Sequence, residues 1–483
     1  MSGDTRRIRI NASHIIAFDA RAGGHRYLRD GVIVVEGDSI IHVGQGFAGQ
    51  VDETIDASGR IVTPGFVNVH AHLAGSPLDK SFIEDRGPRQ FYLSGLFEYL
   101  PARGAGQDAE ATQACFDYSL VELLRSGTTT ILEMGPLVEE AIPSAVAAGI
   151  RLYLGPGIRD GRWYTDNGRT VRYDWDEEAG RAALRRAVAF IERHDGTHNG
   201  LIKGFLAPMQ VDTCTEGLLR AVRHAADRLR VPVQLHVSQS VNEFQEMIAR
   251  HGQTPLEWLE HLGFLAPDVI LGHAIVLGGG TWANYQADDL GIIARSGASV
   301  AHAVWVFARR GIALESFSRY LAAGVPMALG TDTAPQSMLE ALKFTAVVSK
   351  LVDRQTEVAT AADVFNAATL GGAHAIGRDD LGRIAPGAKA DLLFFDARSL
   401  WMTPLRDPIK NIVYSAQAHD IADVMINGAI VVRDRQVLGL DERAICQRLQ
   451  AGAERMWPAM AAGHWAGRGV DELSPQSFPA WED

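Results

Sequence analysis

Five residues of this chain have side chains that bind divalent metal ions and activate water: His70, His72, His236, His273 and Asp332. The first two lie in the segment GFVNVHAH and are two positions apart, so on a β-strand their side chains point to the same side. Neutral imidazoles together with a carboxylate suit a transition metal such as Zn²⁺ or Fe²⁺. These residue types therefore predict metal-assisted hydrolysis, provided that the fold brings them together.

Eight apolar segments between residues 64 and 385 have the composition of buried parallel strands, and Ala-, Arg- and Leu-rich segments with helical spacing separate them. The predicted strands are residues 65–72, 128–135, 151–158, 201–208, 231–238, 268–275, 297–304 and 326–333. Eight such units predict a TIM barrel, whose catalytic groups lie at the C-terminal ends of the strands. The five metal-competent residues fall at the ends of the first, fifth, sixth and eighth predicted strands. Chance placement of five ordinary core residues does not readily explain this pattern.

The two ends of the chain have a different texture from the centre, with short alternating segments broken by Gly and Asp turns. We expect residues 1–63 and 386–440 to pair into one small β-sandwich beside the barrel of residues 64–385. Residues 441–483 are expected to form a terminal helix and a tail. The predicted fold class is therefore α/β, with a (β/α)8 barrel and a β-sandwich built from both chain ends.

Composition narrows the classes of partner and compartment. The 483 residues are 47% hydrophobic, which is enough for a large core, and the formal net charge is −12 without a long basic tract. We therefore expect a small-molecule substrate and neither nucleic acid nor a membrane as partner. The first residues lack a signal-peptide pattern, and the three cysteines are widely spaced, which together predict a cytoplasmic protein.

The stretches TPGFVNVHAHL, QLHVS, LGHAI, ALGTDT and LGRIAPGAKADLLFFD together resemble the amidohydrolase superfamily, in its cytosine deaminase and chlorohydrolase-like branch. The resemblance covers nearly the whole chain, and the ordered set of motifs is far more specific than the HxH pair alone. It implies a (β/α)8 barrel, a small-molecule substrate and, as is usual for these enzymes, a homo-oligomer.

The resemblance also assigns roles to the five residues. It implies that His70, His72, His236 and Asp332 bind one divalent metal ion per chain, with zinc expected first and iron, cobalt or manganese as alternatives. His273 would hold the attacked oxygen or the metal-bound water. Asp332 would accept a proton from that water, whose pKa falls toward about 7 on a metal ion.

The fifth strand departs from the deaminases that the chain resembles. Those enzymes carry His-x-x-Glu, whose glutamate moves protons, whereas this chain has His236-Val-Ser-Gln239. An amide forms hydrogen bonds but does not ionise, and general acid–base help is typically worth about 10²–10⁴-fold. Gln239 is therefore kept as a candidate catalytic residue. It argues against classical ring deamination unless another acid takes over; alternatively, it is only a polar residue at the strand mouth.

Two more strands depart from the deaminase pattern. Met209 stands where deaminases commonly place a histidine that meets the substrate, and an apolar run, Val304–Phe307, follows His302. We expect a pocket less polar than that of a nucleobase deaminase, with Met209, His302 and Trp305 in contact with the substrate. Trp305 and Phe307 fit packing between barrel and helix equally well.

Two long connections follow the first and third strands, where this fold carries its specificity loops. In the first, Glu84, Asp85 and Arg86 could contact a ligand, although surface ion pairs are the better expectation. The second contains Trp163 and Tyr164 as candidate lid aromatics, and Trp163 is a predicted substrate contact. Lys203, by contrast, lies near the start of the fourth strand, so a metal-bridging role as in binuclear relatives is not expected.

The preferred prediction is a mononuclear, metal-dependent hydrolase of a non-peptide C–N bond of the amide, carbamate or urea type. A heterocyclic amine deaminase or an s-triazine chlorohydrolase is the alternative within enzymes. A ligand-binding relative without catalysis is the alternative from another class, and retention of all five metal-competent residues argues against it.

Overall fold

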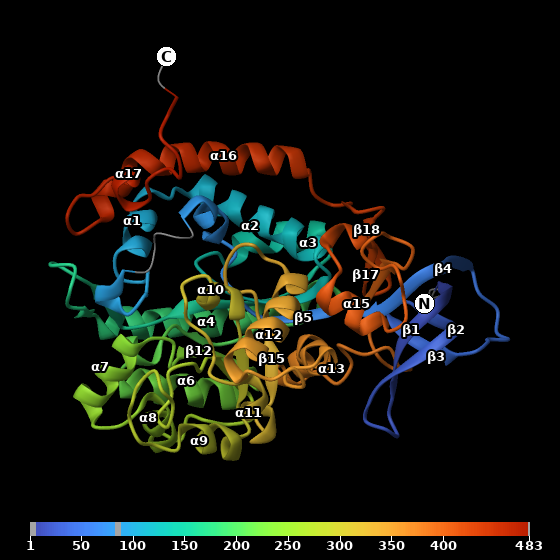
Figure 1. Cartoon of the computed structure of the whole chain (residues 1–483), viewed down its shortest axis with the longest axis horizontal. Coiled ribbons are helices and arrows are strands. Elements are labelled where there is room, and N and C mark those ends of the chain that lie inside the picture. The colour runs from blue at the N-terminus through green and yellow to red at the C-terminus, as the bar shows by residue number, and fades with distance from the viewer. Residues whose placement is uncertain (1–5, 83–87, 482–483) are drawn as a thin grey trace.

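The computed structural model describes residues 6–82 and 88–481, so Glu84, Asp85 and Arg86 lie outside the described residues. A ring of parallel strands surrounded by helices forms the larger part of the molecule, and a β-sheet lies at one side of it (Figure 1). The strands of the ring are β5 (Phe66–Ala71), β6 (Thr128–Gly135), β7 (Arg151–Ile158), β10 (Ile202–Gly204), β11 (Ala207–Pro208), β12 (Val233–Val237), β13 (Val269–His273), β14 (Ser299–His302) and β15 (Met327–Leu329).

The ring is assembled from two parallel sheets. One has the order β10-β7-β6-β5, with β11 also paired to β7, and the other has the order β12-β13-β14-β15. Isolated bridges close both seams: Ala71 pairs with Asp332 on one side, and Gln210 pairs with His236 on the other. This closed parallel ring is the predicted barrel architecture.

The fourth strand position is less regular than predicted. Instead of one strand over 201–208, the chain forms the two short strands β10 and β11. The reason is a switch of hydrogen-bonding partner: Phe205 N–H donates to Leu154 on β7, whereas Leu206 N–H donates to Pro232 on the opposite side. The lysine of this segment, Lys203, lies in β10 and pairs with Asp195 at 2.8 Å. It therefore lies toward the start of the fourth strand position, as expected.

The barrel strands are apolar on both faces, which explains their continuous hydrophobic runs. In β6, Leu132 and Met134 belong to the cluster that fills the barrel interior, whereas Ile131, which directly precedes Leu132, packs in the cluster under the surrounding helices. The alternation of side chains along a strand thus decides which positions can reach the mouth of the barrel.

Amphipathic helices cover the ring. The predicted helix after Thr215 forms as α6 (Glu216–Leu229), capped by the Thr215 hydroxyl and burying Leu218, Leu219 and Val222. The other longer helices of the barrel region are α2 (Ala109–Arg125), α3 (Ile142–Ala148), α4 (Glu177–His194), α7 (Val241–His251), α8 (Pro255–His261), α9 (Asp289–Ser296), α11 (Phe317–Ala322), α12 (Met338–Asp353) and α13 (Ala361–Asn366).

The two chain ends pair with each other, as expected. They form one continuous sheet of eight strands in the order β19-β18-β17-β16-β4-β1-β2-β3. Its edge strand β3 is linked back to the segment before β16 by a hydrogen bond from Ile40 N–H to Ala388 at 2.8 Å, so the sheet curls around its own apolar core. The strands are β1 (Arg7–Asp19), β2 (Gly24–Glu36), β3 (Ser39–Gly44), β4 (Glu53–Pro64), β16 (Leu392–Asp396), β17 (Ile421–Ile426), β18 (Ala429–Arg433) and β19 (Gln436–Val437).

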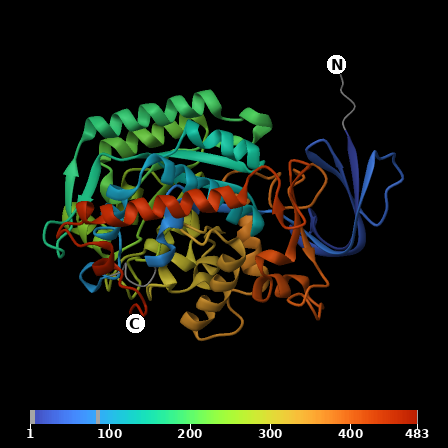
Figure 2. The same ribbon diagram turned by 90° about the horizontal axis from the view of Figure 1, so that it is seen from above.

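A buried ion pair between Arg151 at the start of β7 and Asp391 just before β16 ties this sheet to the barrel. We retain the division into residues 1–63 with 386–440, 64–385 and 441–483 as a proposal. Within the last of these segments, α16 (Glu442–Ala459) packs on α1 (Tyr99–Gly106) and α2, and Figure 2 shows it as the long red helix crossing the barrel. Among the residues that the structure describes, no helix combines the length and apolar composition needed to cross a bilayer.

Candidate active site

The five metal-competent residues converge at the C-terminal end of the barrel, and we call them the histidine cluster. The Nε2 atoms of His72 and His236 are 3.0 Å apart. The Asp332 carboxylate lies 3.5 Å from Nε2 of His72 and 3.7 Å from Nε2 of both His70 and His273. Two overlapping triads of these ligand atoms each fit within 4.8 Å. The structure therefore brings together residues that are up to 262 positions apart.

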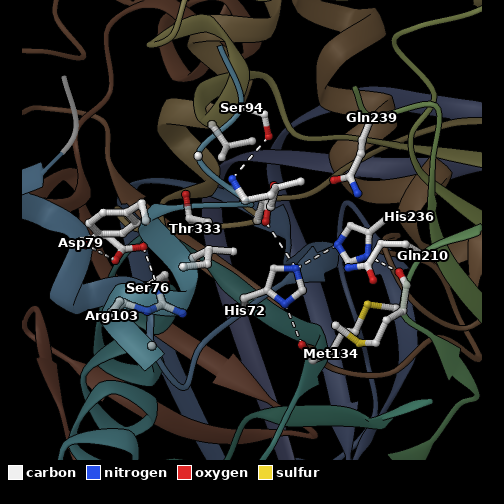
Figure 3. A pocket seen from close by; sticks show the side chains of 18 of the residues that line it. His72, Ser76, Asp79, Ser94, Arg103, Met134, Gln210, His236, Gln239 and Thr333 are labelled. Carbon is white, nitrogen blue, oxygen red and sulfur yellow. Dashed lines mark hydrogen bonds and ion pairs between the residues drawn. The ribbon is translucent and has the colours of Figure 1, made fainter. Parts of the chain in front are cut away.

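Three of the four rings are held from behind by their Nδ1 atoms. The acceptors are the Gln234 amide oxygen for His70 at 3.1 Å, the Met134 carbonyl for His72 at 2.6 Å, and the Met209 carbonyl for His236. Because an oxygen acceptor requires the proton on Nδ1, the Nε2 lone pairs point toward one another, and Figure 3 shows His72 and His236 in this arrangement. Such orientation by outer hydrogen bonds is typical of metal-ligating histidines.

Burial keeps the rings of His70, His236 and His273 neutral. It lowers the pKa of His70 to about 3, with a further contribution from His72, and it lowers the pKa of His236 and His273 well below the ordinary value. The buried Nε2 of His70 has no hydrogen-bond partner among the described residues. Neutral, inward-facing nitrogens with an adjacent carboxylate fit a divalent cation, and this ligand set is suited to a metal.

The backbone at the cluster is unusual. His273 and Asp332 have positive φ angles of 83° and 60°, and Ser238 and Ala274 beside them have 52° and 47°. Non-glycine residues adopt this left-handed region at a cost, and such positions concentrate at functional sites. The strands end in turns that direct these side chains across the barrel mouth.

The cluster opens into a cavity of about 880 Å³, a size that suits a small-molecule ligand. Its lining includes Met209 and Trp163, two of the four predicted substrate contacts, and Gln239, the candidate catalytic residue. Gln239 is buried, its Nε2 atom has no partner among the described residues, and its side chain lies near His236 in Figure 3. Its backbone N–H donates to the Glu243 carboxylate at 3.0 Å, so the main chain is fixed while the amide stays available.

Two predicted substrate contacts lie elsewhere. The run after His302 forms the short helix α10 (Val304–Ala308), in which Phe307 faces the cavity and Trp305 packs against Phe344 of α12 with ring centroids 4.8 Å apart. His302 is buried beside Phe317, its pKa is lowered to about 4 by burial, and it does not line the cavity. A helix turns successive side chains by about 100°, so Trp305 and Phe307, which are two positions apart, point about 200° apart and cannot share one face.

Among the polar residues that line the cavity and that sequence reasoning missed are Glu133, Arg159 and Arg162. Glu133 is buried in β6, accepts the Leu73 N–H at 2.8 Å, and has its pKa raised to about 8 by burial, so it is protonated at neutral pH. One signal was available for it: an ionisable residue within the buried run TTTILEMG. The two arginines lie in a connection whose conformation has no comparable pattern.

Comparisons with known proteins agree with this geometry. The profile described as "Amidohydrolase family" matches residues 61–431. A 5'-deoxyadenosine deaminase of Methanosarcina barkeri is 28% identical over 453 residues, covering 92% of this chain and 98% of the relative. A 5-methylthioadenosine/S-adenosylhomocysteine deaminase of Halobacterium salinarum is 30% identical over 433 residues, covering 88% and 94%. The crystal structure of an adenosine deaminase from Xanthomonas campestris with bound zinc superposes with a TM-score of 0.78 at 23% identity, covering 93% and 98%.

A parallel barrel with inward-facing histidines and an aspartate at its mouth defines the class of metal-dependent hydrolases. The chain belongs to the amidohydrolase family, which its sequence motifs indicated. It is a hydrolase that acts on carbon–nitrogen bonds other than peptide bonds.

Proposed function

We propose that the chain is a metal-dependent deaminase that replaces an exocyclic amino group on a purine-type heterocycle by a hydroxyl group. The observation that carries the proposal is the similarity, over about nine tenths of the chain, to deaminases of adenine nucleosides, together with a neutral histidine cluster facing a cavity of small-molecule size. The names of these relatives favour this alternative over the amide, carbamate or urea hydrolysis predicted from Gln239.

His70, His72, His236 and Asp332 would hold one divalent ion, with zinc preferred because the deaminase structure from Xanthomonas campestris contains it. The ion would supply Lewis-acid activation, lowering the pKa of water so that hydroxide is available at neutral pH. His273, whose Nε2 faces Asp332 at 3.7 Å, would orient the attacking oxygen.

Asp332 would move the proton. Water adds its oxygen to the ring carbon that carries the amino group, and Asp332 accepts the proton released from that water. The same proton then passes to the departing nitrogen as the carbon–nitrogen bond breaks and ammonia leaves. One carboxylate can do both because it lies beside the Nε2 atoms of His70, His72 and His273 at the mouth of the barrel.

Gln239 would take the place that an acid occupies in other deaminases. Its free amide Nε2 can donate a hydrogen bond to a ring nitrogen but cannot transfer a proton to it. The proposed enzyme is therefore best suited to rings that accept an added nucleophile without full protonation, such as rings with several nitrogens or electron-withdrawing substituents.

A substrate panel tests the proposal. The zinc-loaded protein is incubated with aminopurine nucleosides and aminopyrimidines, and in parallel with N-aryl ureas, carbamates, anilides and chloro-s-triazines, with products identified by mass spectrometry. Ammonia released from a ring amine is the expected result. An organic amine released by cleavage at a carbonyl, or chloride from a triazine, would replace the deaminase assignment. Metal binding without turnover of any compound would instead favour the non-catalytic alternative.

A further inference from the structure

The wall of the cavity after β7 carries two positive charges that the protein does not neutralise. Arg159 and Arg162, which we call the arginine wall, both line the cavity that contains the histidine cluster, and both side chains are exposed to it. Among the described residues, neither guanidinium makes a hydrogen bond or an ion pair within 4.0 Å. The three other arginines lining the cavity differ: Arg103 pairs with Asp79 at 2.9 Å, Arg309 donates to the Thr333 hydroxyl at 3.2 Å, and Arg310 donates to the Val306 carbonyl at 2.9 Å.

Neither of the two carboxylates nearest in the chain pairs with these arginines among the described residues. Asp160, between the two arginines, accepts the Thr215 N–H at 3.0 Å and its hydroxyl at 2.6 Å. Asp174 lies opposite Arg162 in the hairpin register, yet the two side chains form no ion pair. In a protein of net charge −12, two adjacent cations left without a carboxylate are unexpected.

The two charges also act on each other. Crowding by protein atoms, and then the positive charge of Arg162, lower the pKa of Arg159. Like charges placed together raise the energy of the empty site, and an anion between them would relieve that repulsion. Arginine suits such a role because its planar fork of donors matches carboxylate and phosphate oxygens.

The arginine wall is part of a built structure. Arg162 lies in the hairpin of β8 (Gly161–Tyr164) and β9 (Arg172–Trp175), which is fastened by the buried carboxylate of Asp212. That carboxylate accepts the indole N–H of Trp163 and the hydroxyl of Tyr173, both at 2.7 Å. The Arg250 guanidinium lies 4.8 Å from the centre of the Tyr173 ring, and Tyr173 pairs in register with Trp163. The hairpin therefore holds its cavity side in place before a ligand arrives.

We propose that Arg159 and Arg162 form a subsite for an anionic group, a carboxylate or a phosphate, on a substrate whose ring is held at the histidine cluster. This inference rests on the proposed deaminase function, which it narrows to acidic derivatives of ring amines. A cavity of about 880 Å³ has room for a ring with a charged extension.

Equilibrium binding to the zinc-loaded protein tests the subsite without requiring turnover. One probe series is inosine, inosine 5'-monophosphate and the corresponding inosine 5'-carboxylic acid, which resemble deamination products and differ in charge. A second series, phenol against phenyl phosphate and benzyl alcohol against benzoate, contains no purine. The wild-type protein should bind the charged members at least about tenfold more tightly than the neutral ones.

The double variant Arg159→Gln with Arg162→Gln should reduce that preference to less than about twofold while leaving the binding of inosine unchanged. Arg172→Gln is the matched control, because Arg172 lies in the same hairpin but pairs with Asp166 at 3.3 Å. The proposal is overturned if the double variant keeps the preference, which would place the anion at the metal, or if the wild-type protein has no preference.

The two series separate this inference from the deaminase assignment. Anion preference in the phenyl series without deamination of any ring amine supports the subsite and rejects the proposed function. Deamination without anion preference does the reverse. Tighter binding of the phosphate than of the carboxylate, or the opposite order, identifies which anion the subsite takes.

Discussion

The histidine cluster and the arginine wall face the same cavity, but the protein builds them in different ways. The rings of the cluster lie at strand ends, and three of the four are fixed by acceptors within the barrel, such as Gln234 behind His70. The arginine wall depends on a connection after β7, fastened mainly through Asp212. In the proposed enzyme, the barrel positions the groups that carry out the reaction. The hairpin after β7 would select the ligand, and its sequence could change without displacing the reacting groups.

The largest effect is expected from a change within the cluster. His236→Ala should abolish metal binding and lower turnover by about a thousandfold or more, because water is then no longer activated. Metal content by mass spectrometry and melting temperature with and without chelator are the measurements. The chelator should lower the wild-type melting temperature by about 5 °C or more and leave that of the variant nearly unchanged. The control is His302→Asn, a change at a buried residue nearby but outside the cavity, and this variant should keep its metal. Loss of metal would mean that metal binding depends on more than the five residues of the cluster.

Asp332→Asn tests the role of this carboxylate in turnover separately from its effect on the fold. The amide keeps the size of the side chain but cannot accept the proton, so turnover should fall by about 10²–10⁴-fold while the fold is retained. Circular dichroism and single-turnover ammonia release measure the two properties. Activity near that of the wild type would remove Asp332 from the proton pathway.

Gln239→Glu changes a cavity residue that belongs to neither the histidine cluster nor the arginine wall. The side chain lies in the cavity with its Nε2 unpartnered, so a carboxyl group of equal size fits there without repacking. Supplying the acid should raise the deamination of aminopyrimidines or aminopurines by about 10–100-fold and add a new limb to the pH–rate profile. An unchanged rate, with the variant folded, would mean that pocket shape rather than the missing acid limits the reaction.

Asp212→Ala should loosen the β8–β9 hairpin and leave the histidine cluster intact. Two donors, on Trp163 and Tyr173, would lose their acceptor, at a cost of about 1–3 kcal/mol for each buried group. We expect KM to rise about tenfold while kcat and metal content change less than about threefold. Asp174→Ala, in an exposed position of the same hairpin, is the control. Loss of metal in the Asp212 variant would show that the two regions are not independent.

Trp305→Phe should have the smallest effect. Its ring packs on Phe344 outside the cavity, and its indole N–H is buried without a partner among the described residues, so phenylalanine loses no hydrogen bond. We expect kcat/KM within about twofold of the wild type and a stability change of about 1 kcal/mol or less. A tenfold loss of activity would make Trp305 a substrate contact after all.

Much of the fold follows from local patterns. Seven of the eight predicted strands form as single strands, because buried parallel strands leave continuous apolar runs that periodicity detects. The positions of His70, His72 and Asp332 at strand ends then locate the candidate site. The break between β10 and β11 was not predictable, since it arises from a hydrogen bond to Pro232, which directly precedes β12 and is distant in the chain.

The substrate side of the site was harder to predict. In the sequence, Trp305 and Phe307 form one apolar aromatic run. Only the turn of α10 directs Phe307 to the cavity and Trp305 to α12. In the sequence, Arg159 and Arg162 cannot be distinguished from ordinary surface charges. Only the structure shows that Asp160 bonds to Thr215 and that Asp174, opposite Arg162, forms no ion pair with it. The presence or absence of a partner is a property of tertiary packing, and no sequence spacing encodes it.

The closure of the barrel has a consequence for assembly. On one seam, His72 N–H donates to the Asp332 carbonyl at 2.7 Å and Asp332 N–H donates to the His70 carbonyl at 2.9 Å. On the other seam, His236 N–H donates to the Met209 carbonyl at 3.0 Å. The backbone that joins the two half-barrels thus belongs to the residues of the cavity itself. A cation held by these side chains would link the two half-barrels at both seams. After metal loading, the backbone amides of Asp332 and His236 should therefore show the slowest hydrogen exchange.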